Sequence, residues 1–191
     1  MRSILRHLVR DWGIEVIFFT IGSHYPSPKG SEERNACYNP IISRIQAFYP
    51  NPVVNSNKVK ILVPGNKNID NFELYFPVGC GLSRLVFELA CLGYAAQGSE
   101  ISFFMILTSE FILNDVENEN QFDIFPYIHN FSNLIKLDDA FAKYSVPDVS
   151  PGEKLPLDAD ISIIAGDFLR VYCRQKGIGN YLSIFYQKIS I

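Results

Sequence analysis

The sequence predicts an α/β protein with an incomplete doubly wound, Rossmann-like parallel sheet and a helical region at its N-terminus. Three observations support this fold class. Short apolar runs alternate with segments of helical periodicity between residues 58 and 168, an order typical of parallel βαβ units. A glycine-rich turn, "GCGLSR", precedes one of the helical segments. The chain has 191 residues, of which 48% are hydrophobic, and this is enough to build a core.

Residues 1–57 are expected to form the helical region. Apolar side chains at helical spacing predict an amphipathic helix over residues 4–12. Three arginines share another face of this helix: Arg2, Arg6 and Arg10. From the residues alone, this basic stripe is interpreted as the solvated side of a packing helix. A second helix is expected over residues 31–49, capped by Ser31, with a kink or break at Pro40.

Residues 58–191 are expected to form the N-terminal half of the sheet domain. Three apolar segments have the length of strands: residues 58–65, 94–100 and 161–168. Two segments between them have the pattern of helices: residues 82–93, which Gly93 ends, and residues 101–115. The polar, proline-containing span 116–160 gives no clear element, apart from one ordered-looking island, "FPYIHNFSN".

Two apolar runs compete for the strand that leads into the glycine turn. The run "KVKILVPG" is wholly apolar at its end, which suits a strand buried on both faces. The run at residues 72–79 carries Glu73 and Pro77, and proline is a poor residue for a central strand. We therefore interpret residues 58–65 as the native first strand.

The composition excludes several kinds of partner. A net charge of −3 lacks the basic character of a nucleic-acid-binding domain. The four cysteines are widely scattered, so neither a zinc site nor a disulfide framework is expected. The apolar run at residues 16–21 is too short for a signal peptide or a membrane span. We expect a soluble protein without metal, nucleic acid or membrane, in the cytoplasm, with the nucleus as a second option.

Three features fall at the ends of predicted strands, where doubly wound folds bind their ligands. Gly79 and Gly81 allow the backbone to approach a ligand closely. Glu100 closes the second strand, where an acid can accept hydrogen bonds from both hydroxyls of a ribose. Asp167 and Phe168 follow the third strand, where an acid can accept from an adenine amino group and a ring can pack against the base. Together these residues predict an adenosine-containing ligand.

The glycine spacing favours S-adenosylmethionine over NAD. Counted from Gly79, the third glycine of a G-x-G-x-x-G motif would fall at position 84, which is Arg84. A dinucleotide needs that close approach to hold its pyrophosphate on the helix N-terminus. An NAD-dependent oxidoreductase is therefore the weaker alternative.

Several segments resemble the carnosine N-methyltransferase family. They are "ILVPG", "CGLSRLVFELACLGYAAQGSEISFFMILTSEFILN", "FPYIHNFSN", "VPDVSP" and "AGDF", with "LRHLVRDW" and "ERNACYNPII" upstream. The resemblance covers most of the chain, and residues 80–114 are a specific part of it. It implies a class I methyltransferase sheet with S-adenosyl-L-methionine as the cofactor. It also implies methyl transfer to an imidazole nitrogen of carnosine, a histidine dipeptide, which gives anserine.

The resemblance implies cofactor contacts for seven residues: Arg10, Gly65, Gly79, Gly81, Glu100, Asp167 and Phe168. Arg10 would reach the carboxylate of the cofactor, a role that replaces the solvated-face interpretation. Either Gly65 or Gly79 would complete the cofactor loop. No residue of the chain receives a catalytic role, and no metal site is implied.

The chain also departs from the family pattern at single positions. His7 stands where the family tends to have glutamine, Ser83 replaces a glycine, and Ile101 replaces a tryptophan. His129 matches the family, and we interpret it as a structural histidine. The substrate-binding residues of the family follow a fourth strand that has no counterpart here.

Three stretches look foreign to the family: residues 13–29, 66–79 and 177–191. Each begins at or just after a glycine, and a glycine codon in that context can read as a splice donor. We hypothesise that they are translated introns and that this chain is an inactive, truncated product. The parent enzyme would act on a small histidine-containing dipeptide, with a homodimer as one option for its assembly. The alternative is a non-catalytic adenosine-cofactor-binding remnant or pseudoenzyme.

Overall fold

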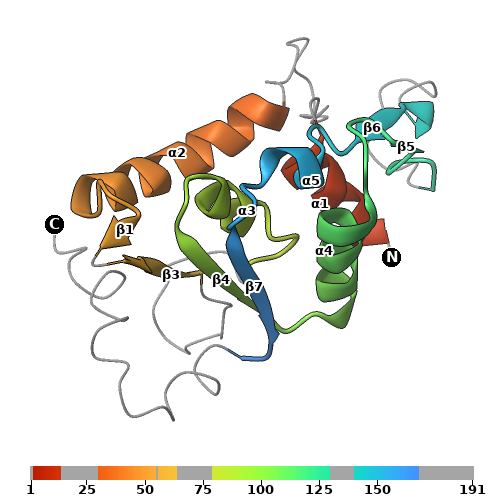
Figure 1. The fold of residues 1–191 in the computed structure, drawn as a ribbon. Coiled ribbons are helices and arrows are strands. Elements are labelled where there is room, and N and C mark those ends of the chain that lie inside the picture. Colours follow the sequence, from red (N-terminus) through yellow and green to blue (C-terminus); the bar gives the residue numbers. More distant parts are fainter. Residues whose placement is uncertain (1, 14–29, 55, 64–78, 130–139, 168–191) are drawn as a thin grey trace, which may run out of the picture. The chain divides into compact units, whose positions relative to one another are not determined.

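The computed structural model describes residues 2–13, 30–54, 56–63, 79–129 and 140–167 of the chain (Figure 1). Two compact units interleave along the sequence. The N-terminal unit comprises Met1–Pro50 and Leu107–Lys154, and the sheet unit comprises Asn51–Ile106 and Leu155–Ile191. Each unit draws on both domains expected from the sequence, 1–57 and 58–191, and that division stays a prediction.

The sheet unit contains a three-stranded parallel sheet in the order β3-β4-β7 (Figure 1). Its strands are β3 (Lys60–Val63), β4 (Ala95–Glu100) and β7 (Asp160–Ala165). Register pairs Lys60 with Ala95, and Glu100 with Ala165. The three strands confirm the predicted α/β class with a parallel sheet.

The strand before the glycine turn is not the central one in the described sheet. Central β4 is buried along almost its whole length, whereas β3 leaves Lys60 exposed and Leu62 half-buried. At the apolar end of this run Ile61 and Val63 are buried on one face and Leu62 is half-buried on the other, so the predicted burial on both faces is seen in part, and residues 64–65 lie outside the described residues. The strand begins at Lys60 rather than at residue 58, because Asn57–Lys58 forms β2 and pairs with β1 (Val53–Val54) instead.

Helix α3 (Arg84–Cys91) packs against the sheet and confirms the helix expected over residues 82–93. Val86 and Leu89 are buried as the periodicity predicts, but Leu92 is 39% exposed and Phe87 takes its place in the core. The helix ends before Leu92 because Gly93 adopts a left-handed conformation, φ +90°, and donates its N–H to the carbonyl of Ala90 at 2.9 Å.

The N-terminal unit is built on α1 (Arg2–Trp12) and α2 (Gly30–Phe48), which pack together. Val9 and Trp12 bury the apolar face of α1. Helix α2 continues through Pro40 to Phe48, so the expected break at Pro40 is not seen. Proline is tolerated there at the loss of one backbone hydrogen bond.

A small antiparallel hairpin was not foreseen from the sequence. Strands β5 (Phe122–Ile124) and β6 (Tyr144–Val146) pair within the span 116–160, and α5 (Pro151–Lys154) follows them. Strand β6 packs on α1, where Tyr144 and Val9 share an apolar cluster. The polar composition of the span hid these short strands, since β5 exposes Phe122 and Asp123.

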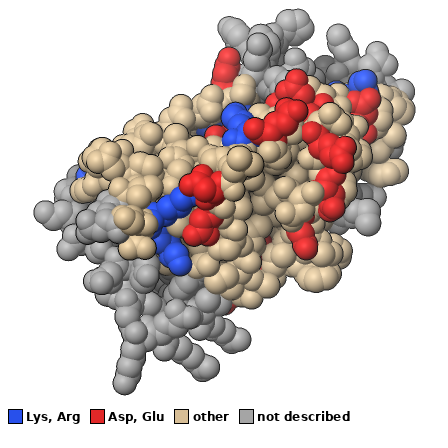
Figure 2. Space-filling view, in the orientation of Figure 1, with Lys and Arg blue, Asp and Glu red and all other residues tan. Residues whose placement is uncertain are grey.

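Helix α4 (Phe103–Asp115) confirms the helix expected over residues 101–115. It buries few side chains, chiefly Ser109 and Ile112. Within the described residues, no helix combines the length and apolar character that crossing a bilayer requires. On the face drawn in Figure 2, acidic side chains are more widespread than basic ones, in keeping with the net charge of −3.

Candidate cofactor site

The glycine turn lies against the C-terminal end of β4. Gly79 and Gly81 both have positive φ angles, +78° and +55°. The N–H of Cys80 donates to the carbonyl of Ser99 at 3.0 Å, and this bond ties the turn to the end of the central strand. The turn closes where Ser83 donates its N–H to the carbonyl of Cys80 at 2.8 Å.

The carboxylate of Glu100 meets this turn. One carboxylate oxygen, Oε2, accepts the N–H of Gly81 at 2.9 Å. The other, Oε1, accepts the N–H groups of Ile101 and Ser102, both at 2.9 Å. Glu100 is only 6% exposed, so its charge is held by backbone donors in a nearly buried position.

The third predicted feature reaches the same end of β4. Gly166 donates its N–H to the backbone carbonyl of Glu100 at 2.8 Å, and Asp167 follows, half-buried. The structure thus brings Gly79, Gly81, Glu100 and Asp167 to the C-terminal end of the parallel strands. Gly65 and Phe168 lie outside the described residues.

The donors from Ile101 and Ser102 were not among the predicted site residues. Their signal in the sequence is the position of Glu100, an acid just before the start of a predicted helix. Free N–H groups at a helix start favour a carboxylate acceptor. The acid that was predicted to bind a ribose therefore also binds the backbone at the entry to α4.

Cys80 packs beneath the turn without becoming a reactive group. A Cβ at Gly98 would lie 2.7 Å from its sulfur, so glycine is needed where the turn crosses β4. Burial raises the pKa of the Cys80 thiol to about 11; the hydrogen bond to Ser83 opposes the rise and the nearby charge of Glu100 adds to it. The thiol is therefore protonated at neutral pH and is no nucleophile.

Arg10 belongs to the other unit. It lies in the last turn of α1 and its side chain, 43% exposed, pairs with Asp11 at 2.7 Å. The contact between Arg10 and a cofactor carboxylate stays a prediction.

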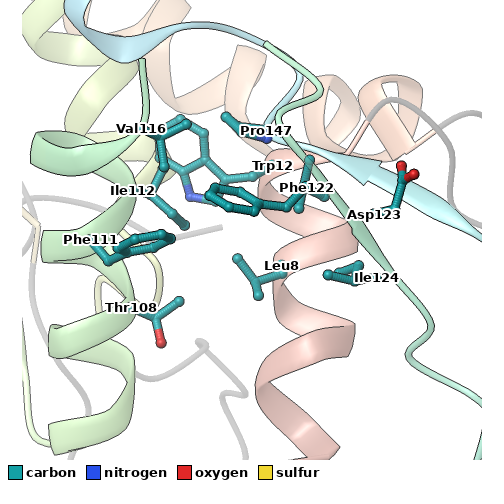
Figure 3. A pocket seen from close by; sticks show the side chains of 11 residues that line it. Leu8, Trp12, Thr108, Phe111, Ile112, Val116, Phe122, Asp123, Ile124 and Pro147 are labelled. Carbon is teal, nitrogen blue, oxygen red and sulfur yellow. The ribbon is translucent and has the colours of Figure 1, made fainter. Parts of the chain in front are cut away.

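The N-terminal unit contains a cavity of about 260 Å³ between α1, α4 and the hairpin. In Figure 3, the rings of Trp12, Phe111 and Phe122 border it, and the carboxylate of Asp123 points away from these rings. Hydrogen bonds from Ser145 and Lys143 hold that carboxylate and lower its pKa. The cavity offers few polar groups, so it does not suit the sugar and amino acid of S-adenosylmethionine.

Comparison with known proteins identifies the family of this chain. A family model described as carnosine N-methyltransferase matches residues 1–187. The chain belongs to the carnosine N-methyltransferase family. The resemblance found in the sequence is thereby confirmed, and the family is one of methyltransferase enzymes.

Relatives from distant organisms support the assignment. The carnosine N-methyltransferase of Schizosaccharomyces pombe is 38% identical over 170 residues, which make up 89% of this chain and 38% of that protein. The one from Mus musculus is 38% identical over 172 residues, 90% of this chain and 36% of that protein. A Drosophila melanogaster relative, carnosine N-methyltransferase unmet, is 37% identical over 171 residues, 90% of this chain and 31% of its own. The chain thus spans between 31% and 38% of the length of these relatives.

The structure gives a reason why the family pattern places a glycine at position 83. Ser83 is fully buried and has φ +61°, in the left-handed region, directly before α3. Glycine adopts this conformation without steric cost, whereas a side chain does not. One residue later, buried Arg84 binds Glu88 at 2.8 Å and lies over the ring of Phe87. A bulky side chain therefore occupies the position of the third dinucleotide-binding glycine.

Proposed function

We propose that this chain provides the cofactor-binding part of an S-adenosylmethionine-dependent N-methyltransferase with a Rossmann-like class I sheet. The observation that carries the proposal is the meeting of the Glu100 carboxylate with the glycine turn at the C-terminal end of β4. Ligands of doubly wound folds bind at this end of the strands. Family membership supports the reaction class.

The described residues fit an adenosine ligand in chemical terms. Glu100 would accept a ribose hydroxyl, Asp167 would accept from the adenine amino group, and the turn from Gly79 to Gly81 would face the rest of the cofactor. A carboxylate has about four acceptor positions, and three backbone donors already use three of them. Glu100 therefore has room for one ribose hydroxyl, and it takes a second only if Gly81 is released.

The cofactor would supply a methyl group bound to a positively charged sulfur. We propose that the acceptor is an imidazole nitrogen of a histidine dipeptide, as the name of the relatives, carnosine N-methyltransferase, suggests. Such a transfer depends on positioning and on exclusion of water. The contribution of this chain is to hold the adenosine end, while no residue of it is assigned to the imidazole.

Calorimetric titration of the purified chain with S-adenosylmethionine, S-adenosylhomocysteine and NAD tests the proposal. We expect both sulfur ligands to bind and NAD to give no heat. Asp167→Ala should weaken binding about tenfold, the effect expected for the loss of one hydrogen bond to a charged acceptor. Glu110→Ala removes an exposed acid on α4; it is the matched control and should bind like the wild type.

The outcomes separate the candidate functions. Binding of NAD without binding of S-adenosylmethionine would contradict the proposed cofactor. Binding of S-adenosylmethionine without methylation of added carnosine would favour the non-catalytic adenosine-binding alternative.

A further inference from the structure

The conformation of the glycine turn depends on a side chain from the neighbouring strand. A Cβ built on Gly79 would lie 1.9 Å from Oε2 of Glu100 and 2.7 Å from its carboxyl carbon. The same oxygen accepts the N–H of Gly81 at 2.9 Å. The group that approaches Gly79 closely is therefore the carboxylate of Glu100, and the missing side chain of Gly79 makes room for it.

We propose that Glu100 is a positioning residue for the glycine turn and sets the conformation of residues 79–81 before any cofactor binds. The proposal rests on the proposed function only in assuming that the turn binds the cofactor. A residue that served the ribose alone would need no bond to Gly81 and no contact with Gly79.

The acceptor character of the carboxylate is essential to this arrangement. The three hydrogen bonds that the carboxylate of Glu100 receives from the described residues all come from backbone N–H groups. An amide in its place has one oxygen and one NH₂ group. In Glu100→Gln the oxygen can serve Ile101 and Ser102, but the NH₂ group then faces the N–H of Gly81, and two donors oppose each other. The bond to Gly81 is the one that this substitution breaks.

Two contacts hold the glycine turn, one from the backbone of β4 and one from the side chain of Glu100. On one side, Cys80 donates to the carbonyl of Ser99 at 3.0 Å, which fixes the turn to the backbone of β4. On the other side, Glu100 reaches back over the turn to Gly81. The backbone bond alone anchors one residue, and the carboxylate adds the second anchor that defines the turn.

Amide hydrogen exchange measured by NMR on the ligand-free chain tests the proposal. We expect the Gly81 amide to be protected in the wild type and to exchange about tenfold faster or more in Glu100→Gln, since a hydrogen bond to a charged acceptor is lost. The amides of β4 should keep their rates, which a general loss of stability would not allow. Glu110→Gln is the matched control and should leave Gly81 unchanged.

Two results would overturn the proposal. One is a Gly81 amide that exchanges at the rate of an open loop in the wild type, a measurement that remains available if the variant fails to fold. The other is a Glu100→Gln protein with wild-type exchange at Gly81, which would leave Glu100 with a ribose role at most.

A coupled pair of variants gives an independent check through thermal unfolding. Gly79→Ala should lower the melting temperature of the wild type, because the new methyl group meets the carboxylate. In a Glu100→Ala background, the same change should cost less, since only the strain of a side chain at φ +78° remains once the space is open. Equal costs in both backgrounds would contradict the contact. Because no ligand is used, these results do not depend on whether S-adenosylmethionine binds.

Discussion

Ser83 carries a side chain at a position where the backbone conformation favours glycine. It is buried in a left-handed conformation at the start of α3, where an L-residue costs about 1–2 kcal/mol. Glycine removes this cost but loses roughly 0.5–1 kcal/mol through its greater freedom in the unfolded chain. We expect Ser83→Gly to raise the free energy of unfolding by roughly 0.5 kcal/mol, as measured by urea titration.

A matched variant separates the backbone effect from the hydroxyl. The Ser83 hydroxyl lies 3.5 Å from the sulfur of Cys80, which is a weak contact. Ser83→Ala removes that hydroxyl but keeps the Cβ, so it should bring no gain. If Ser83→Gly were no more stable than Ser83→Ala, backbone strain at this position would not be the reason for the family glycine.

At the scale of elements, a buried ion pair holds the C-terminal end of α1. The guanidinium of Arg34, on α2, binds the carboxylate of Asp148. It also donates to the carbonyls of Gly13 at 3.0 Å and Arg10 at 3.3 Å. The N–H of Asp148 adds a bond to the carbonyl of Trp12 at 2.7 Å. The last carbonyls of a helix have no hydrogen-bond partner within the helix, and these contacts supply partners from outside it.

Loss of this pair should destabilise the N-terminal unit. The side chains of Arg34 and Asp148 are 5% and 9% exposed, and removing one partner of a buried pair costs about 3–5 kcal/mol. We expect Arg34→Met to lower the free energy of unfolding by about this amount in urea titrations. Adding Asp148→Leu should recover part of the loss, because the unpaired charge is then gone.

Arg44, on the same helix, provides the control. It is exposed and stacks over the ring of Phe48 at 4.8 Å, a contact worth about 0.5–1 kcal/mol. Arg44→Met should therefore cost less than about 1 kcal/mol. Similar losses for the two arginines would show that burial of the Arg34 pair is not decisive.

At the scale of the whole molecule, the hypothesis that residues 66–79 are a translated intron bears on the candidate cofactor site. The carboxylate of Glu100 leaves no space for a side chain on the residue before Cys80. A chain without residues 66–79 would place Gly65 there, so a glycine precedes Cys80 in both versions. The intron hypothesis thus keeps the one residue type that this position accepts.

We predict that the mature transcript lacks the codons for residues 66–79. We also predict that a deletion variant without them keeps its affinity for S-adenosylhomocysteine in calorimetry. The same deletion combined with Gly65→Ala is the control, and it should lose affinity because the new methyl group meets Glu100. A mature transcript that retains these codons would contradict the hypothesis.

The sequence alone was enough for the α/β class, three strands, four of the helices and the family. Each of these depends on local patterns: apolar runs, helical periodicity, and the glycines and acids that follow strands. The acid at position 100 could be singled out for the same reason, since it ends an apolar run about twenty residues after the glycine turn.

Only the tertiary structure decided which strand is central, that the span after residue 115 contains a hairpin, and what fills the space beside Gly79. The pair of Arg34 and Asp148 joins residues 114 positions apart, and the bond from Gly81 to Glu100 spans 19. Contacts of this kind depend on how elements pack and on the φ angles of a few residues. Local composition carries no record of either, which is why the site residues were predictable as types and their partners were not.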